Sequence, residues 1–201
     1  IRRRLSPLLN TDRRKIEVLN SMLFSLPGSP FIYYGDEIGM GDNIRLNDRD
    51  GVRTPMQWTA QAGGGFSSAP VEKWSTPASG DVPWSPAYIN VEAQQADPGS
   101  LLNLMRRMIQ VRKAHPAFSW GDLAWVDHFP REVAAYWRRF EGDRLLVLNN
   151  LSAEMHILIV PLPADAGALQ VLLDSRGASV SRHNDVLQVT LRAYNYLWVA
   201  I

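Results

Sequence analysis

The chain has 201 residues, 46% hydrophobic and 20% charged, a composition typical of a soluble globular protein with a substantial core. Its 21 lysines and arginines against 20 acidic residues leave a net charge of +1, which is too balanced for a typical nucleic-acid-binding protein with a strongly basic face. No apolar run approaches the roughly 18 residues of a membrane span. The absence of cysteine excludes a disulfide framework, a thiolate metal site and a thiol nucleophile. It is compatible with a reducing compartment, so we expect a cytoplasmic protein.

The sequence begins Ile1-Arg2-Arg3-Arg4, without an initiating methionine or an apolar signal segment, so we expect it to be part of a longer chain. Residues 1–15 hold six cationic side chains and one acidic side chain, Asp12. We interpret this charge run as a solvated helix face, or as one that meets acidic partners; a phosphate or nucleic-acid patch is the alternative.

An amphipathic helix is predicted over residues 12–26, capped by Asn10 or Thr11 and ended by the Pro-Gly-Ser-Pro segment 27–30. Its apolar stripe recurs at three- and four-residue spacing, at Ile16, Leu19, Leu23 and Leu26. The segment 31–34, Phe-Ile-Tyr-Tyr, favours a buried strand. Acidic residues follow at once, and a helix, a buried strand and acids at the strand's carboxyl end are typical of an α/β-barrel unit.

Residues 39–97 show little periodicity and predict a long loop, with Gly63-Gly64-Gly65 as a flexible break. A second amphipathic helix is predicted from Asp97, as its N-cap, to the His115-Pro116 step. Beyond residue 120 the sequence predicts seven short strands, 122–127, 133–140, 144–150, 155–161, 168–173, 186–191 and 194–200. Glu141-Gly142-Asp143 is typical of a hairpin turn, and strands at this spacing indicate an antiparallel β-sandwich.

Several kinds of site lack a signature in this sequence. The four histidines show no metal-ligand spacing, and neither a phosphate-binding glycine loop nor a Gly-x-Ser-x-Gly nucleophile motif occurs. We therefore predict no metal and no cofactor. The loop tryptophans have two interpretations, stacking on sugar rings or anchoring the loops; they are Trp58, Trp74, Trp84 and Trp120.

Polar side chains cluster after the predicted barrel strand, where barrel enzymes carry their sites. Carboxylates and guanidinium groups can each make two hydrogen bonds to neighbouring hydroxyls, which suits a polyhydroxylated ligand. An ion-paired network that only holds the loop in place is an equal alternative. The cluster comprises Asp36, Glu37, Asp42, Asn43, Asp48, Arg49, Asp50, Arg53 and Gln57.

The run Gly-Ser-Pro-Phe-Ile-Tyr-Tyr-Gly-Asp-Glu-Ile-Gly-Met over residues 28–40 resembles the last barrel strand of the α-amylase family, family 13 of the glycoside hydrolases and transferases. Asp-Arg-Asp-Gly-Val-Arg-Thr-Pro-Met-Gln-Trp over residues 48–58 is similar to the α-glucosidase and trehalose synthase branch of that family. Residues 89–94 and 108–113 match the same branch. Residues 1–9 and 41–44 look most like the trehalose synthases.

The resemblance implies the C-terminal fragment of a TIM (β/α)8 barrel followed by an antiparallel β-sandwich. We place the barrel part at residues 1–117 and the sandwich at residues 118–201. The family's retaining mechanism uses an Asp nucleophile, a Glu acid/base and a second Asp in an Asn-His-Asp stretch. The resemblance implies that all three residues lie upstream of this chain, and no Asn-His-Asp stretch occurs here, so we expect no catalytic residue and no turnover by this chain alone.

The resemblance also assigns substrate-binding residues. It implies that Arg53 and the Arg49-Asp50 pair lie in the loop beside the sugar pocket, with Asp36 and Glu37 under the pocket in a mainly supporting role. It makes Asp42 and Asn43 candidates for the pocket rim. Residues 59–88 depart from the family pattern, which leaves the substrate preference of that loop open.

The function that the resemblance implies is interconversion of maltose and trehalose by retaining glucosyl transfer. The alternatives are part of an α-glucosidase or oligo-1,6-glucosidase, and a non-catalytic β-sandwich that binds carbohydrate or acts as a scaffold. Expected partners are small sugars (maltose, trehalose and glucose), with neither nucleic acid nor membrane. Exposed barrel-strand edges could support an oligomer.

Overall fold

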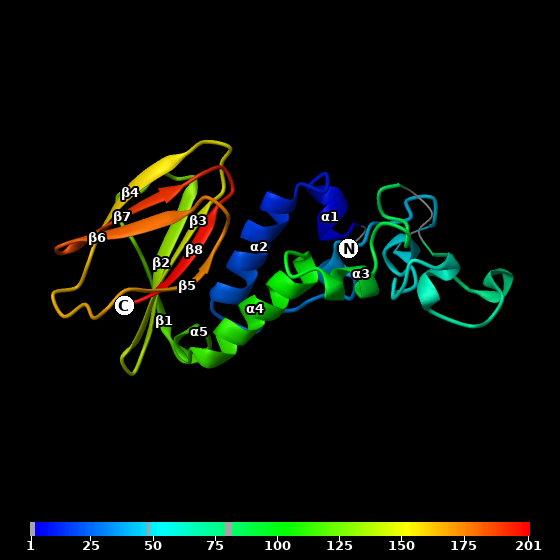
Figure 1. Ribbon diagram of the computed structural model, residues 1–201, viewed down its shortest axis with the longest axis horizontal. Helices are drawn as coiled ribbons and strands as arrows, with labels where there is room; N and C mark the ends of the chain where they lie inside the picture. The colour runs from blue at the N-terminus through cyan, green and yellow to red at the C-terminus, as the bar shows by residue number, and fades with distance from the viewer. Residues whose placement is uncertain (1–2, 48, 79–81) are drawn as a thin grey trace. The chain divides into compact units, whose positions relative to one another are not determined.

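The computed structural model describes residues 3–47, 49–78 and 82–201, so Arg2 and Asp48 of the predicted clusters lie outside the described residues. The chain forms two compact units, each continuous in space but not in sequence (Figure 1). The first unit comprises Ile1–Ile16 and Phe31–Arg107, and the second comprises Glu17–Pro30 and Met108–Ile201. The domain boundary predicted near residue 118 stays a prediction. None of the described helices is both long and apolar enough to cross a membrane.

Short helices and loops build the first unit. Its buried core joins side chains from the 36–40 turn, the 50s loop and two helices, namely Ile38, Met40, Met56, Val91 and Leu102. Its helical segments are α1 (Leu5–Leu8), the 3-10 turns η1 (Asp36–Ile38), η2 (Asp50–Val52), η3 (Ala62–Gly65) and η4 (Val71–Lys73), α3 (Val91–Ala96) and the first half of α4 (Leu101–Ala114).

The predicted buried strand over residues 31–34 is wrong. These residues form no strand, and Phe31 is 88% exposed. A strand is stable only when neighbouring strands complete its hydrogen bonds, and the described part of the first unit contains no other strand. The barrel-strand edge that we expected to support an oligomer is therefore not formed here.

Both long helices lie where the periodicity predicted them, but the residues that cap their N-termini differ from the predicted ones. α2 spans Arg13–Ser25, and Asp12, not Asn10 or Thr11, caps it by accepting the Arg14 amide at 3.1 Å. α4 begins at Leu101 because the Ser100 hydroxyl caps it by accepting the Asn103 amide at 3.2 Å. Asp97 instead forms a turn with the Gly99 amide. A further helix that the periodicity did not indicate is α3, and the Asn90 side chain caps its first turn by accepting the Ala93 amide at 2.8 Å.

The second unit contains the predicted antiparallel sheets. One sheet has the strand order β1-β2-β3-β8-β5 and the other β4-β7-β6. All seven predicted strands form, and the Glu141-Gly142 turn joins β2 to β3 as predicted, with both residues at positive φ. The strands are β1 (Asp122–Trp125), β2 (Val133–Phe140), β3 (Asp143–Asn150), β4 (His156–Pro161), β5 (Gln170–Asp174), β6 (Ser179–His183), β7 (Val186–Leu191) and β8 (Tyr196–Ala200).

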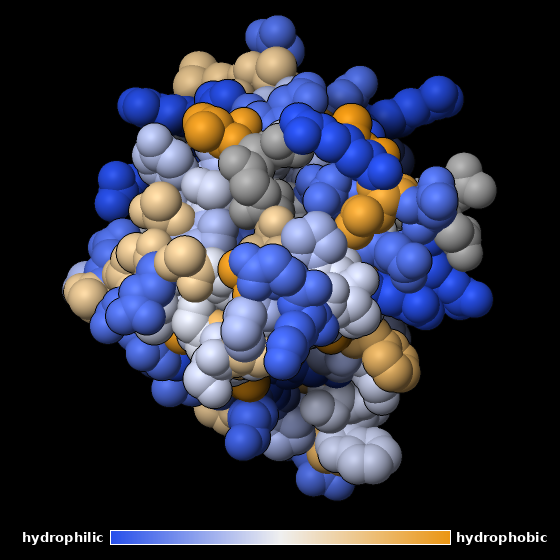
Figure 2. All heavy atoms as spheres, turned by 90° about the vertical axis from the view of Figure 1, so that its right-hand side faces the viewer, coloured by the Kyte–Doolittle hydropathy of each residue, from blue (hydrophilic) through white to orange (hydrophobic). Residues whose placement is uncertain are grey.

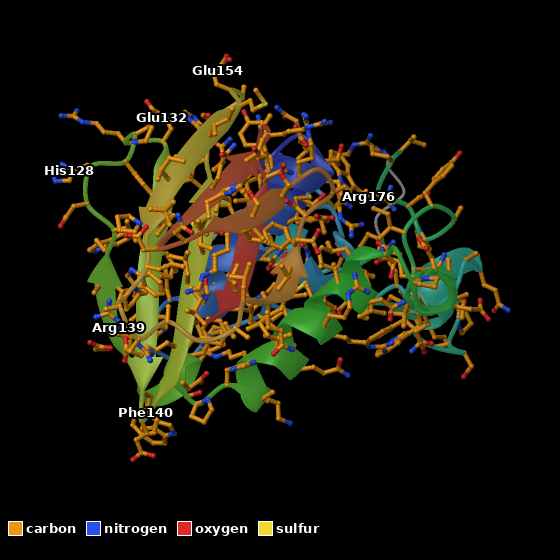
Figure 3. The ribbon with its side chains drawn as sticks, turned by 60° about the vertical axis from the view of Figure 1, so that its left-hand side comes forward. His128, Glu132, Arg139, Phe140, Glu154 and Arg176 are labelled. Carbon is orange, nitrogen blue, oxygen red and sulfur yellow. The ribbon has the colours of Figure 1, made fainter. Side chains whose placement is uncertain are left out.

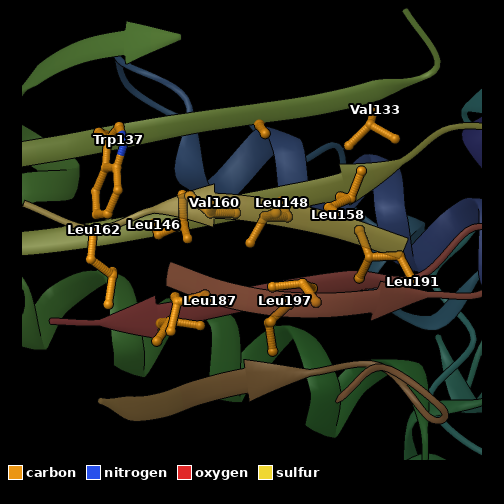
Figure 4. Close-up of a cluster of buried hydrophobic side chains, with 13 residues drawn as sticks. Val133, Trp137, Leu146, Leu148, Leu158, Val160, Leu162, Leu187, Leu191 and Leu197 are labelled. Carbon is orange, nitrogen blue, oxygen red and sulfur yellow. The ribbon is translucent and has the colours of Figure 1, made fainter. Parts of the chain in front are cut away.

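Apolar residues on the facing sides of the two sheets form the core of the second unit (Figure 4). Alternation places them there: on β4, Leu158 and Val160 are buried whereas Ile157 and Ile159 are exposed. The structure contains one strand more than predicted, β6. The sequence did not indicate it because its residues, Ser-Val-Ser-Arg-His, offer no apolar face. It forms at the sheet edge by pairing with β7.

A buried polar network joins α2 to the larger sheet within the second unit. The Ser21 hydroxyl donates to the Asn149 side chain at 2.6 Å and accepts the Trp198 indole N–H at 2.8 Å. The Ser25 and Tyr136 hydroxyls lie 2.6 Å apart. Because Ser21 and Ser25 are four residues apart, they share one helix face. That face is buried, so the apolar stripe does not define the buried side of α2.

The same network predicts alkaline sensitivity. Burial raises the pKa of Tyr136 to about 12 from its ordinary 10.0. Between pH 10 and 12 the Tyr136 hydroxyl loses its proton in the unfolded chain but keeps it in the folded chain. The stabilisation that is present below pH 10 is therefore lost as the pH rises towards 12. We expect about 2 kcal/mol of the free energy of unfolding to disappear. Urea unfolding between pH 9 and 12 measures this loss. An equal decrease of the free energy of unfolding with pH in Tyr136→Phe would contradict its origin in Tyr136.

Candidate functional site

The first unit holds two cavities that together contain four of the five predicted substrate-binding residues. A large cavity of about 620 Å³ is lined by Glu37 and Arg53, among others. A small cavity of about 260 Å³ is lined by Asp36, Arg49 and Arg53. Arg53 is common to both, and the fifth residue, Asp50, contacts it directly. The structure thus gathers the predicted site around one guanidinium group.

A tight turn orients the two acids of the site. Gly35 and Gly39, both in the left-handed region, flank the 3-10 turn at residues 36–38. The Glu37 carboxylate accepts the Gly35 amide at 2.6 Å. A side chain at Gly35 would meet the sulfur of Met40 at 2.5 Å, so only glycine fits this position.

Arg4 holds together the segments that line the small cavity. It is buried, and its guanidinium donates to the Tyr34 carbonyl and, at 2.7 Å, to the Val52 carbonyl. The aromatic rings of Tyr33 and Tyr34 lie 4.9 and 4.7 Å from it. One side chain therefore connects the turn that carries Asp36 with the segment that carries Arg53.

The predicted rim residues Asp42 and Asn43 line neither cavity. The Asp42 carboxylate is buried, accepts the Arg4 backbone amide at 2.9 Å and pairs with Arg3 at 3.0 Å. The Asn43 amide donates to the Gly51 carbonyl at 2.9 Å. The Asn43 side chain accepts the Arg45 amide at 3.2 Å in an exposed turn. The Asp42 carboxylate is therefore already occupied inside the protein, whereas a place of Asn43 at the pocket rim stays a prediction.

Arg53 and Asp50 can change partners at low cost. Their ion pair spans 3.6 Å, and both side chains are about half exposed. Exposed pairs of this kind contribute about 0–1 kcal/mol, so a ligand hydroxyl can replace one partner. The ion pair with Asp50 therefore leaves the Arg53 guanidinium available to a ligand.

Asp36 offers a carboxylate oxygen that has no hydrogen-bond partner among the described residues although it is buried. Burial raises the pKa of Asp36 above its ordinary value, and the nearby Arg4 guanidinium partly opposes that shift. A hydroxyl donor that entered the small cavity would satisfy this oxygen.

Of the four aromatic residues that line the large cavity as its aromatic wall, the sequence pointed to Trp58 and Trp74 but not to Tyr34 and Phe66. Tyr34, Trp58, Phe66 and Trp74 line it together with Lys73. Phe66 and Trp74 meet edge to face with ring centroids 5.8 Å apart. Figure 2 views the loops of the first unit end-on, with hydrophobic side chains scattered among hydrophilic ones. Only the loop tryptophans gave a signal for this wall.

The glycine run that was predicted as a flexible break is an ordered turn that supports this wall. Gly63, Gly64 and Gly65 all have positive φ, and the Gly64 carbonyl accepts the Trp58 amide at 2.7 Å. The Trp74 ring lies against Gly63 and donates from its indole N–H to the Ala69 carbonyl at 3.0 Å. Trp74 therefore both anchors the loop and lines the cavity, whereas Trp84 packs on Gly41 and lines no described cavity.

Among residues 3–47, 49–78 and 82–201, the structure holds no group of three or more histidine, cysteine, aspartate or glutamate side chains placed to bind a metal ion. The chemistry that this arrangement supports is hydrogen bonding and aromatic stacking to a polyhydroxylated ring.

Comparison with known families divides the chain near residue 120. A model described as the α-amylase catalytic domain matches residues 2–121, and a domain of unknown function (DUF3459) matches residues 120–194. The chain is 46% identical over 177 residues to trehalose synthase from Thermus thermophilus, covering 88% of this chain and 18% of that protein. It spans between 18% and 35% of the length of the curated trehalose synthases that it matches.

Two solved structures show the same fold. The crystal structure of an α-amylase from H. orenii has a TM-score of 0.76 and 27% identity, over 99% of this chain and 38% of that chain. An isomaltulose synthase mutant from Erwinia rhapontici, crystallised with D-glucose, has a TM-score of 0.73 and 22% identity, over 99% of this chain and 41% of that chain.

These matches confirm the predicted fold class, part of an α-amylase catalytic domain followed by antiparallel β-sheets. The family model alone covers more than half of the sequence. The chain therefore belongs to the α-amylase family.

Proposed function

We propose that this chain is part of a trehalose synthase-like enzyme that interconverts maltose and trehalose, and that its two cavities contribute to the sugar-binding site. The observation that carries the proposal is the position of Arg53, which lines both cavities beside Asp36, Glu37 and Arg49. The identity to a trehalose synthase over 88% of the chain supports this choice of reaction.

The residues present suit binding rather than bond cleavage. Guanidinium and carboxylate groups pair with adjacent sugar hydroxyls, and the apolar face of a pyranose ring packs on aromatic side chains such as Trp58 and Trp74. The retaining mechanism of the family needs a nucleophile and an acid/base about 5 Å apart across the scissile bond. Their motifs do not occur in this sequence, so we infer that the chain alone does not turn over maltose.

Sugar analysis tests the proposal. The 201-residue chain and the product of the complete reading frame are each incubated with maltose, and the sugars are separated by chromatography. We expect trehalose from the longer product and no conversion by the chain alone. Glucose without trehalose would favour the α-glucosidase alternative, and conversion by the chain alone would contradict the absence of catalytic residues.

A further inference from the structure

The second unit contains a strongly exposed tryptophan. Trp120 is the last residue of α5 (Ala117–Trp120), and its side chain is 77% exposed. Neither the fold nor the proposed function accounts for this exposure, because the indole contributes little to the core and lines neither cavity of the first unit. An exposed aromatic ring can stack on a ligand where neighbouring polar groups are placed to orient that ligand.

Hydrogen bonds from a buried arginine hold the backbone that carries Trp120. The fully buried Arg138 guanidinium donates to the carbonyls of Phe118 at 3.1 Å, Gly121 at 3.0 Å and Asp122 at 3.1 Å. A side chain at Gly121 would lie 2.3 Å from the Ala117 carbonyl oxygen, so the turn admits only glycine. Trp120 is therefore presented on an ordered support, which lowers the entropy cost of binding a ligand.

Trp120 lines an open depression of about 580 Å³ that combines this aromatic surface with paired charges. Arg139, opposite Asp122 in the β1–β2 register, lies with Phe140 at the hairpin end of β2 (Figure 3). Arg144 pairs with Asp165 at 2.7 Å on the same lining. The aromatic and charged side chains of the lining are Trp120, Asp122, Arg139, Glu141, Arg144 and Asp165.

We propose that this depression binds a neutral oligosaccharide of hexopyranose units, with Trp120 as the stacking surface. Three carboxylates and two guanidinium groups leave no strong net charge, which disfavours nucleic acid and other polyanions. The same groups are bidentate partners for vicinal hydroxyls. The open form of the depression suits several units of a sugar chain better than one enclosed small molecule.

The site is independent of the proposed function, because none of its lining residues belongs to the two cavities. Its test uses maltoheptaose and the 201-residue chain carrying Arg53→Ala, which weakens the contribution of those cavities. The indole N–H resonance of Trp120, assigned with Trp120→Phe, is followed by nuclear magnetic resonance during the titration. We expect it to shift, while that of Trp125, an exposed tryptophan outside the lining, stays in place.

In the same background, Trp120→Ala is expected to weaken maltoheptaose affinity about fivefold or more, whereas Trp125→Ala leaves it unchanged. Trp120→Phe, which keeps an aromatic ring, should retain most of the affinity, and equal thermal midpoints show that the variants remain folded. A Trp120 resonance that does not move, or equal affinity in Trp120→Ala, would overturn the proposal. Titration with a peptide library that shifts Trp120 when maltoheptaose does not would also overturn it and identify a protein-docking surface.

Discussion

Replacing Arg138 with methionine is expected to lower the free energy of unfolding of the second unit by about 3 kcal/mol or more. The buried guanidinium donates to four backbone carbonyls, those of Ser25, Phe118, Gly121 and Asp122. Methionine has similar length but no donor, so these acceptors would lose a charge-assisted partner in a place that water reaches poorly. Urea unfolding followed by the circular dichroism of the sheets measures the change.

The neighbouring position supplies a matched control. Arg139 lies next to Arg138 on β2, is exposed, and stacks over Trp137 with its guanidinium 5.5 Å from the ring centroid. Arg139→Met removes the same charge and is expected to cost less than about 1 kcal/mol. Equal losses in the two variants would show that net charge, and not the buried hydrogen bonds, stabilises this unit.

The second large effect is expected at Arg53. In the product of the complete reading frame, Arg53→Ala should lower maltose turnover at least tenfold, which corresponds to about 1.4 kcal/mol. The reason is the loss of a charged group that lines both cavities and whose ion pair with Asp50 is weak enough to yield to a sugar hydroxyl. Initial rates of trehalose formation across maltose concentrations separate an effect on KM from one on kcat.

Arg45→Ala is the control for this experiment. Arg45 is an exposed arginine of the same loop region and lines neither cavity. Its replacement should leave the rate close to that of the unchanged protein. Normal kinetics in Arg53→Ala would remove Arg53 from the site, and an equal decrease in Arg45→Ala would indicate a general electrostatic effect.

The candidate site was predictable where it depends on short-range sequence. Glu37 and Arg53 belong to continuous motifs, and the family resemblance of those motifs pointed to them, whereas residue types and spacing alone left an ion-paired loop network as an equal alternative. The loop tryptophans were recognisable as stacking candidates, but their assembly into a wall was not predictable, because Phe66 and Trp74 come together in a loop without periodicity and through a turn that needs positive φ at Gly63. The exclusion of Asp42 also required the structure, since only the position of Arg4 shows that its carboxylate is already occupied.

By itself, the sequence determined the elements whose pattern is complete within consecutive residues. Apolar alternation specified the strands of the second unit, the Glu141-Gly142 turn specified a hairpin, and helical periodicity placed α2 and α4. Tertiary structure alone decided which face of α2 is buried: Leu19 and Leu23 remain 36% and 37% exposed, while Ser21 and Ser25 are enclosed by hydrogen bonds to distant strands. It also decided that residues 31–34 form no strand, and that polar β6 does. Strand formation depends on a partner for the backbone, and a segment's own residues do not reveal whether that partner is present.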